Sequence, residues 1–169
     1  NDTTATGEGP NSFRSIQAAI NFASDGDEVN VASGNYFENI NFRGRAIVVN
    51  GTGTSTIDGG GNGTVVTFDS GEDETTVLNK FIIQNGSGTD AWPYAAGGIL
   101  CNDASPKLED LVIEENSGTY AGGILLYSSE AQLNNLIITN NSSSSYSGGI
   151  YTDWSNPVMN NLVITNNTG

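Results

Sequence analysis

Apolar and polar residues alternate in short runs along most of this chain, and in its second half the alternation itself repeats. The repeating part begins at residue 78 and reads LNKFIIQNGSG…AAGGIL, then LEDLVIEENSGTYAGGILLY, LNNLIITNNSSSSYSGGIYT and MNNLVITNNTG. Strict alternation of this kind predicts half-buried β-strands. The sequence from 78 to 169 therefore predicts a repeat protein built from short strands and turns.

A Gly-Gly-Ile triplet marks each full copy and begins at Gly97, Gly122 and Gly148. Its first glycine stands 11 residues before the leading residue of the next copy each time (97 to 108, 122 to 133, 148 to 159). The path from a leading residue to the following glycine pair varies: it takes 19, 14 and 15 residues. One loop per copy holds all of this variation, and in repeat proteins such loops often hold function.

Equivalent residues at equivalent positions favour copies that stack in parallel and in register. One inward wall then comes from Leu108, Leu111 and Ile113 with their counterparts Leu133, Leu136, Ile138, Met159, Leu162 and Ile164. A second inward column holds Ile99, Ile124 and Ile150, with Cys101, Leu126 and Thr152 beside it. Such an interior is dry and closely packed, so we expect any ligand to bind on the outside.

The N-terminal part predicts a lead-in, a helix and irregular strands. Residues 1–12 are polar and glycine-rich, and we expect a flexible lead-in there. Ser15 is a candidate N-cap before an apolar stripe of Ile16, Ala19, Ile20 and Ala23, which predicts a short amphipathic helix. Short alternating strands follow. We expect one β-domain over 13–169, with the helix capping its N-terminal end.

The last copy predicts an open end. It stops at Gly169, where the earlier copies turn toward a glycine pair. An uncovered end of a parallel solenoid exposes strand edges, which natural repeat proteins cap. We therefore expect the C-terminal coil to be incomplete, which indicates either a fragment of a longer chain or a homo-oligomer formed through this end.

Charge narrows the classes of partner. The chain has 19 acidic and 5 basic residues, for a formal charge of −14. Nucleic acids and anionic membrane surfaces bind clustered Lys and Arg, so we expect neither as a partner. No apolar run reaches the roughly 18 residues of a membrane helix, so no membrane insertion is predicted. The acidic composition, rich in Asn, Ser, Thr and Gly, favours a secreted or cell-surface protein.

Catalytic signatures are mostly missing. The sequence has no histidine, which excludes Ser-His and Cys-His nucleophile systems and histidine-bound metals. The acidic run 72–74 has the oxygen ligands that calcium prefers, but no calcium motif supports a site, so we predict no metal and no cofactor. Lys80 beside Asp110 is interpreted as a salt bridge between coils. Other carboxylates could be paired for glycoside hydrolysis but match no hydrolase motif, so no catalytic residue is assigned.

Two other sets of residues recur with the repeat. Asn116, Asn141 and Asn167 occupy the same turn, and we expect a structural ladder in which each side-chain amide satisfies backbone groups of neighbouring coils. Tyr120 and Tyr146 each lie two residues before a glycine pair, which predicts rings stacked about 4.8 Å apart. With two aromatics of the longest loop they form a predicted ligand-binding aromatic edge: Trp92, Tyr94, Tyr120 and Tyr146.

Exposed aromatic faces can hold neutral sugars or protein partners without charge. The alternative interpretation is that these rings only cover the glycine pairs, which have no side chains to shield the backbone. Tyr151 and Trp154 follow the third glycine pair, and we expect them to form a second aromatic patch on another face.

The segments SIQAAINFA and DGDEVNVASGNYFENINF, followed by repeats that combine G-G-I with I-x-x-N, resemble the right-handed parallel β-helix superfamily that includes the pectate lyases. The repeats are also similar to those of bacterial secreted and surface proteins, among them the polymorphic outer-membrane adhesins. The resemblance covers residues 13–169 and implies fold more than activity. Gly86 departs from the I-x-x-N pattern in the first repeat.

These observations lead to an all-β, right-handed parallel β-helix with an N-terminal capping helix, from a secreted or surface-exposed bacterial protein. We expect a non-catalytic module for adhesion or glycan binding, with a neutral glycan or a surface protein as partner. The enzyme alternative is a polysaccharide lyase or hydrolase of the pectate-lyase-like superfamily. A third alternative is a structural spacer that associates with itself.

Overall fold

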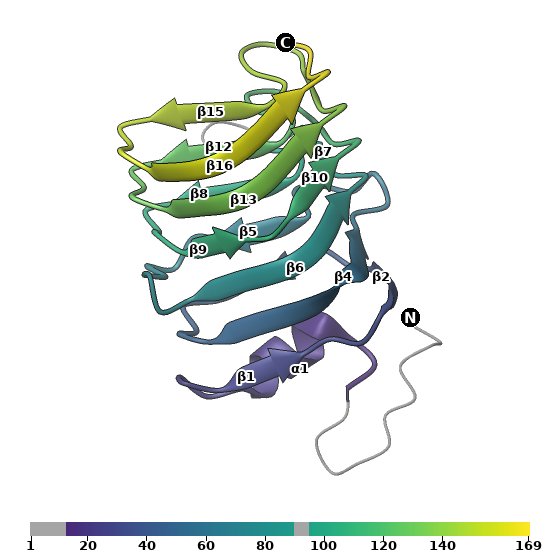
Figure 1. Cartoon of the computed structure of the whole chain (residues 1–169), viewed down its shortest axis with the longest axis vertical. Helices are drawn as coiled ribbons and strands as arrows, with labels where there is room; N and C mark the ends of the chain where they lie inside the picture. Colours follow the sequence, from purple (N-terminus) through teal and green to yellow (C-terminus); the bar gives the residue numbers. More distant parts are fainter. Residues whose placement is uncertain (1–12, 90–94) are drawn as a thin grey trace.

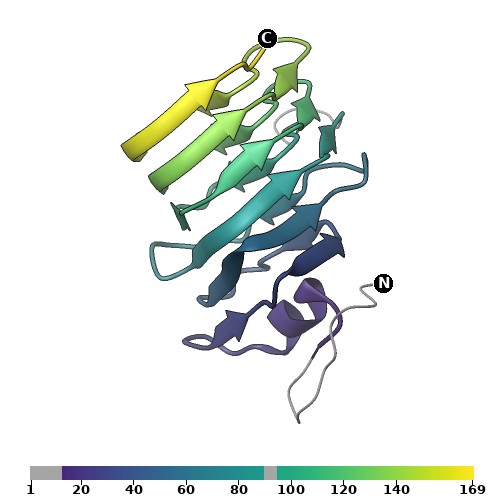
Figure 2. The ribbon, with the colours of Figure 1, turned by 45° about the vertical axis from the view of Figure 1, so that its right-hand side comes forward.

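A computed structural model describes residues 13–89 and 95–169. The predicted lead-in, residues 1–12, and the predicted ligand-binding residues Trp92 and Tyr94 lie outside the described residues. Figures 1 and 2 show a solenoid in which each coil lies on the previous one, with the N-terminal and C-terminal coils at opposite ends. Every pairing between named strands is parallel. The predicted class, an all-β parallel solenoid with one short helix, is confirmed.

Three sheets form the walls. The front sheet in Figure 1 contains β1 (Glu28–Asn30), β4 (Val48–Asp58), β6 (Val77–Gln84), β10 (Val112–Glu114), β13 (Gln132–Thr139) and β16 (Val158–Thr165) in spatial order, with β2 (Gly34–Phe37) and β9 (Lys107–Glu109) beside this path. The back sheet contains β15 (Ile150–Asp153), β12 (Ile124–Tyr127), β8 (Ile99–Asn102), β5 (Val66–Phe68) and β3 (Ile40–Asn41). A short sheet holds β14 (Ser142–Ser143), β11 (Ser117–Gly118) and β7 (Ser87–Gly88).

Helix α1 (Ile16–Phe22) closes the N-terminal end, as the apolar stripe predicts. The Ala18 N–H donates to Ser15 Oγ at 3.3 Å, so Ser15 is the N-cap. The Glu38 carboxylate accepts from the backbone N–H groups of Ile16 and Gln17 at 2.9 and 3.0 Å, which satisfies two further donors of the first turn. Because Ile16 and Ile20 are buried in the core, the helix covers the first coil.

The repeat register predicted from sequence sets the core. Ile83, Ile113, Ile138 and Ile164 pair in series across the front sheet, and Ile99, Ile124 and Ile150 do so across the back sheet. In the inner coils these side chains are fully buried together with Leu108, Leu111, Leu133, Leu136, Cys101 and Leu126. The columns therefore fill the interior with side chains.

A left-handed residue interrupts the front strands β6, β13 and β16, and another separates β9 from β10. Lys80, Asp110, Asn135 and Asn161 have φ between 51° and 60° and occupy equivalent positions in successive coils. One residue in this conformation shifts the phase of the alternation. Because Asp110 has this conformation, residues 108 and 111 both face inward although they are three positions apart, and residue 113 then follows at the usual spacing of two.

The last coil departs from the prediction for its inward residues. Met159 and Ile164 are 41% and 49% exposed, whereas their counterparts Leu133 and Ile138 in the coil below are fully buried. Thr152, expected beneath the second inward column, is exposed as well. The reason is that no further coil of the described chain lies on β16 or β15.

Candidate functional site

The stacking that the repeat spacing predicts is present on the outside of the solenoid. Tyr120 and Tyr146 have ring centroids 4.9 Å apart and an interplanar angle of 11°. Tyr151 projects from β15 and lies 4.9 Å from Tyr146 with its ring tilted by 43°. We call these three residues the tyrosine cluster. Burial raises the pKa of Tyr151, and the neighbouring Asp153 adds to that effect.

A small apolar cluster lies under these rings. It contains Ala96, Leu100, Ala121 and Leu125, and it is separate from the main core. Leu100 and Leu125 lie on the outer face of the back sheet, yet they are 2% and 0% exposed. Tyr120 and Tyr151 pack against them, so these two tyrosines cover an outer apolar surface. What Tyr120 covers is this apolar cluster, whereas the alternative interpretation from the sequence had the rings cover the glycine pairs.

Tyr146 differs from its neighbours because its side chain is 54% exposed. One face of its ring rests on Tyr120, which is itself supported by the apolar cluster. Tyr146 is therefore a large aromatic side chain held by packing and open to solvent. A rigid aromatic surface of this kind loses little conformational entropy when a ligand binds.

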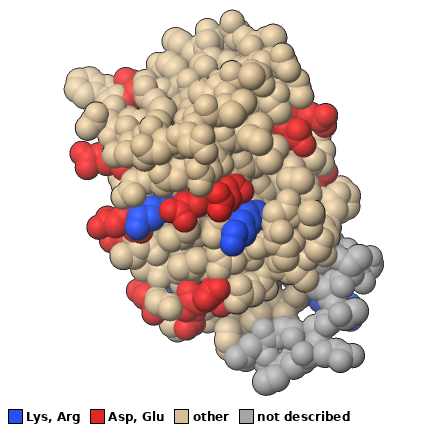
Figure 3. All heavy atoms as spheres, viewed as in Figure 1, with Lys and Arg blue, Asp and Glu red and all other residues tan. Residues whose placement is uncertain are grey.

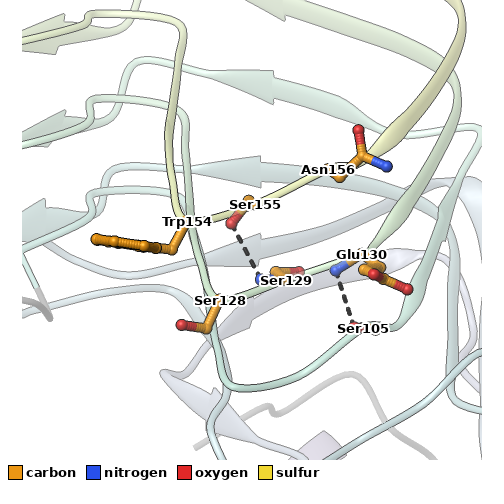
Figure 4. A pocket seen from close by; sticks show the side chains of 7 residues that line it. All are labelled: Ser105, Ser128, Ser129, Glu130, Trp154, Ser155 and Asn156. Atoms are coloured by element: carbon orange, nitrogen blue, oxygen red, sulfur yellow. Dashed lines mark hydrogen bonds between the residues drawn. The ribbon is translucent and has the colours of Figure 1, made fainter.

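The expectation that Tyr151 and Trp154 form a second patch together is wrong. Tyr151 belongs to the tyrosine cluster, whereas Trp154 follows the C-terminal end of β15. The physical reason is that Trp154 has φ 50°, in a left-handed turn beyond the strand, and Figure 4 shows its ring projecting outward from that turn. Trp154 is 83% exposed, more than any other large hydrophobic residue described.

Trp154 borders a hollow of about 650 Å³ at this turn. Figure 4 shows the side chains that line it: Ser105, Ser128, Ser129, Glu130, Trp154, Ser155 and Asn156. These residues come from the same turn in three successive coils. Sequence reasoning missed the hollow because its serines are unremarkable singly, and only the stacking of coils brings them together.

The three asparagines form a continuous hydrogen-bonded column. Asn116 Oδ1 accepts from the Gly86 N–H at 2.8 Å, Asn141 Oδ1 accepts from the Asn116 N–H at 3.0 Å, and Asn167 Oδ1 accepts from the Asn141 N–H at 2.9 Å. Each side-chain amide also donates to a carbonyl of the coil below. Asn116 and Asn141 are each 1% exposed. These amides stabilise turns, and the column leaves little of them accessible to a ligand.

Acidic side chains lie over several coils of the face in Figure 3, but they do not converge. Within residues 13–89 and 95–169, no group of three or more His, Cys, Asp or Glu residues is arranged to hold a metal ion. In the same residues no ion pair joins Lys80 to Asp110, so the expected salt bridge between these coils is wrong. Asp110 instead accepts a hydrogen bond from Asn135 Nδ2 at 3.0 Å.

A second hollow of about 540 Å³ lies beside Asp58 and Phe37. Burial raises the pKa of Asp58, but hydrogen bonds from Gln84, the Gly60 N–H and Asn85 outweigh it and hold the pKa below its usual value. Both carboxylate oxygens are occupied by these bonds. Asp58 is therefore an ionised residue that ties turns together.

The thiol of Cys101 is buried and is not suited to act as a nucleophile. Burial, with a contribution from Glu72, raises its pKa far above the ordinary value. A neutral, inaccessible thiol is a poor nucleophile.

The described residues include no helix both long enough and apolar enough to cross a membrane. Comparison of the chain with protein-family models, curated proteins and solved structures finds no match in any of the three.

Proposed function

We propose that this protein is a non-catalytic binding module, secreted or on the surface of a bacterium, that holds a neutral glycan against its aromatic edge. The observation that carries the proposal is Tyr146, 54% exposed and stacked on Tyr120. A sugar ring presents C–H groups that pack on the face of an aromatic ring. The sequence predicts that Trp92 and Tyr94 extend this edge.

The charge of the molecule supports a neutral ligand. With 19 acidic and 5 basic residues, the protein repels polyanions such as uronate polymers. The tyrosine cluster presents aromatic rings over an apolar base. A surface protein could use the same rings, and it is the alternative ligand for this edge.

A glycan array that contains neutral and acidic glycans tests the proposal. We expect neutral glycans alone to bind, and Tyr146→Ala to weaken binding about tenfold or more. Phe37→Ala is the matched control, because Phe37 is an exposed aromatic residue on β2, with 63% of its side chain accessible. If no glycan on the array binds, and the protein instead captures a surface protein in a way that Tyr146→Ala abolishes, then the ligand of this edge is a protein. Equal binding by Tyr146→Ala and the parent protein would refute the proposal that the aromatic edge binds either kind of ligand.

A second function, self-association through the C-terminal end, is favoured by the exposed apolar strand β16. Val158, Met159, Val163 and Ile164 are 41–52% exposed on this one strand. Asp153 is the only charged residue after Glu130 in a protein of net charge −14, and Figure 3 shows the uppermost part of this face almost free of charge. Because α1 covers the other end, two copies would meet through their C-terminal ends.

Light scattering over a range of concentrations tests this second function. We expect a dimer that Ile164→Glu disrupts, because Ile164 belongs to the inward column. Val163→Glu is the control: the two neighbours are equally exposed, at 49%, but Val163 lies on the outer face of the sheet. A parent protein that stays monomeric at every concentration contradicts self-association.

The resemblance to pectate-lyase-like β-helices and to bacterial surface repeats, with the right-handed coil that it implies, belongs to this proposal. The parallel register and the capping helix support it. An activity screen on uronate polymers checks the enzyme alternative, and we expect no product.

A further inference from the structure

Trp154 occupies a position that the fold does not require to be tryptophan. The same turn position holds Asp103 in one coil and Ser128 in the next, and all three residues have φ of 49–50°. Small polar residues tolerate this left-handed conformation, whereas bulky residues rarely adopt it. Trp154 is also 83% exposed, so its ring gains little from packing. A strained, exposed aromatic residue of this kind points to a role outside folding.

The floor of the hollow beside Trp154 is fixed by serine hydrogen bonds between coils. Ser155 Oγ accepts from the Ser129 N–H at 3.0 Å and donates to the Asp153 carbonyl at 2.9 Å. Ser129 Oγ donates to the Ala104 carbonyl at 2.6 Å, and Ser105 Oγ accepts from the Glu130 N–H at 2.9 Å. Figure 4 shows two of these bonds crossing between the turns. The hollow is therefore built on a rigid support.

Three other polar side chains around the hollow are not used by the fold. Ser128 Oγ, the Glu130 carboxylate and the Asn156 amide make no hydrogen bond to the described residues, and all three residues are exposed. Together they offer a hydroxyl, an anionic acceptor and an amide that both donates and accepts. They line the hollow together with Trp154, whose ring projects from the side opposite Glu130 and Asn156 in Figure 4.

We propose that this hollow is a saccharide-binding site, distinct from the tyrosine cluster, that takes a neutral sugar unit. The Trp154 ring would pack on the C–H face of one sugar unit, and hydroxyls of the next unit along the chain would donate to Glu130 and exchange hydrogen bonds with Asn156. The lining includes one carboxylate and no Lys or Arg, which disfavours uronates and other acidic sugars. A hollow of about 650 Å³ has room for one or two sugar units.

Tryptophan fluorescence gives a direct test, because the chain has only two tryptophans. Trp92→Phe leaves Trp154 as the only tryptophan. The probes are cellohexaose, mannohexaose, xylohexaose and laminarihexaose, with polygalacturonate as the acidic comparison. We expect at least one neutral oligosaccharide to shift the emission in a saturable manner, and polygalacturonate to leave it unchanged.

Calorimetry with that oligosaccharide, on the parent sequence and its variants, identifies the residues responsible. Trp154→Asn is the informative change, because asparagine accepts the left-handed turn and the fold is retained. We expect it to weaken binding about tenfold or more, and Glu130→Gln to weaken it about threefold. Unchanged affinity in Trp154→Asn, or binding of polygalacturonate as tight as that of the neutral sugar, overturns the proposal.

The test separates this site from the proposed glycan edge. Tyr146→Ala in the Trp92→Phe background should leave the fluorescence response of Trp154 unchanged. If no oligosaccharide shifts the emission, the hollow is not a saccharide site, whatever the array shows for Tyr146. If Tyr146→Ala abolishes the response, the signal arises from the tyrosine edge and the hollow is not a separate site.

Discussion

The asparagine column predicts one of the largest effects of a single polar substitution in this protein. The Asn141 side chain makes four hydrogen bonds while only 1% of the residue is exposed. Its Oδ1 accepts from the backbone N–H and from Nδ2 of Asn116, both at 3.0 Å. Its Nδ2 donates to the Ile113 carbonyl at 2.8 Å and to Asn167 Oδ1 at 3.0 Å. Asn141→Ala removes all four.

After Asn141→Ala, some of the groups that were bonded to the Asn141 side chain keep other hydrogen bonds and some do not. Asn116 Nδ2 keeps its bonds to the carbonyls of Ile83 and Glu114, and Asn167 Oδ1 keeps the Asn141 N–H. The Asn116 backbone N–H loses its partner inside the turn, and the Ile113 carbonyl loses a short bond. A buried polar group without a partner costs about 1–3 kcal/mol, and a lost bond about 1 kcal/mol. The expected loss of unfolding free energy is therefore about 2–4 kcal/mol, a large part of the roughly 5–15 kcal/mol of a typical domain.

Urea unfolding followed by far-ultraviolet circular dichroism measures this loss. Asn134→Ala is the matched control, because Asn134 is a half-buried asparagine on β13 that accepts one bond, from Asn160 Nδ2 at 3.0 Å. We expect Asn134→Ala to cost less than about 1 kcal/mol. Equal midpoints and slopes for the two variants would refute the argument that the column satisfies the turns.

Three further predictions concern particular positions. Gly123→Ala should destabilise strongly and Gly149→Ala only mildly, as compared by thermal unfolding, because a Cβ at Gly123 would lie 2.6 Å from the Gly149 carbonyl oxygen, whereas one at Gly149 first meets a side-chain methyl at 3.2 Å. Hydrogen bonds hold the pKa of Asp58 below its usual value, so its ionised form contributes to the free energy of unfolding at any pH above its unfolded-state pKa. That contribution is lost as the pH falls through the folded-state pKa. Asp58→Asn should therefore reduce the decline of the urea midpoint below about pH 4. Cys101 should resist an aromatic disulfide reagent at about pH 8 until urea unfolds the chain, because burial raises its pKa; rapid reaction of the folded protein would contradict this.

The periodicity of the sequence was sufficient to predict the parallel solenoid because each inward column repeats apolar residues at equivalent positions. Ile113 and Ile138 are buried at the positions that the repeat assigns to them. The left-handed corners could not be predicted in the same way. Lys80 and Asn161 share one backbone conformation although their side chains have little in common, so no single residue type marks the corner.

The outer surface was harder to predict for a different reason. Leu125 alternates outward along its strand, which predicts exposure, yet it is fully buried beneath rings from its own coil and the next. Burial of this kind depends on which side chains of neighbouring coils lean over one another. The alternation of apolar and polar residues within one strand does not predict this kind of burial. The hollow beside Trp154 escaped prediction for the same reason, since its lining comes from three coils.

Residues that break a repeat are those least explained by the fold, and in this protein two such breaks lie at opposite ends of one strand. β15 carries Tyr151 where the two coils below carry Leu100 and Leu125, and it is followed by Trp154 where they carry Asp103 and Ser128. Neither aromatic residue is required by the coil, because the shorter residues support the same backbone below. About 10 Å of strand separates positions 151 and 154. The binding surfaces are therefore expected around this coil, where the sequence departs from a repeat that already satisfies the fold.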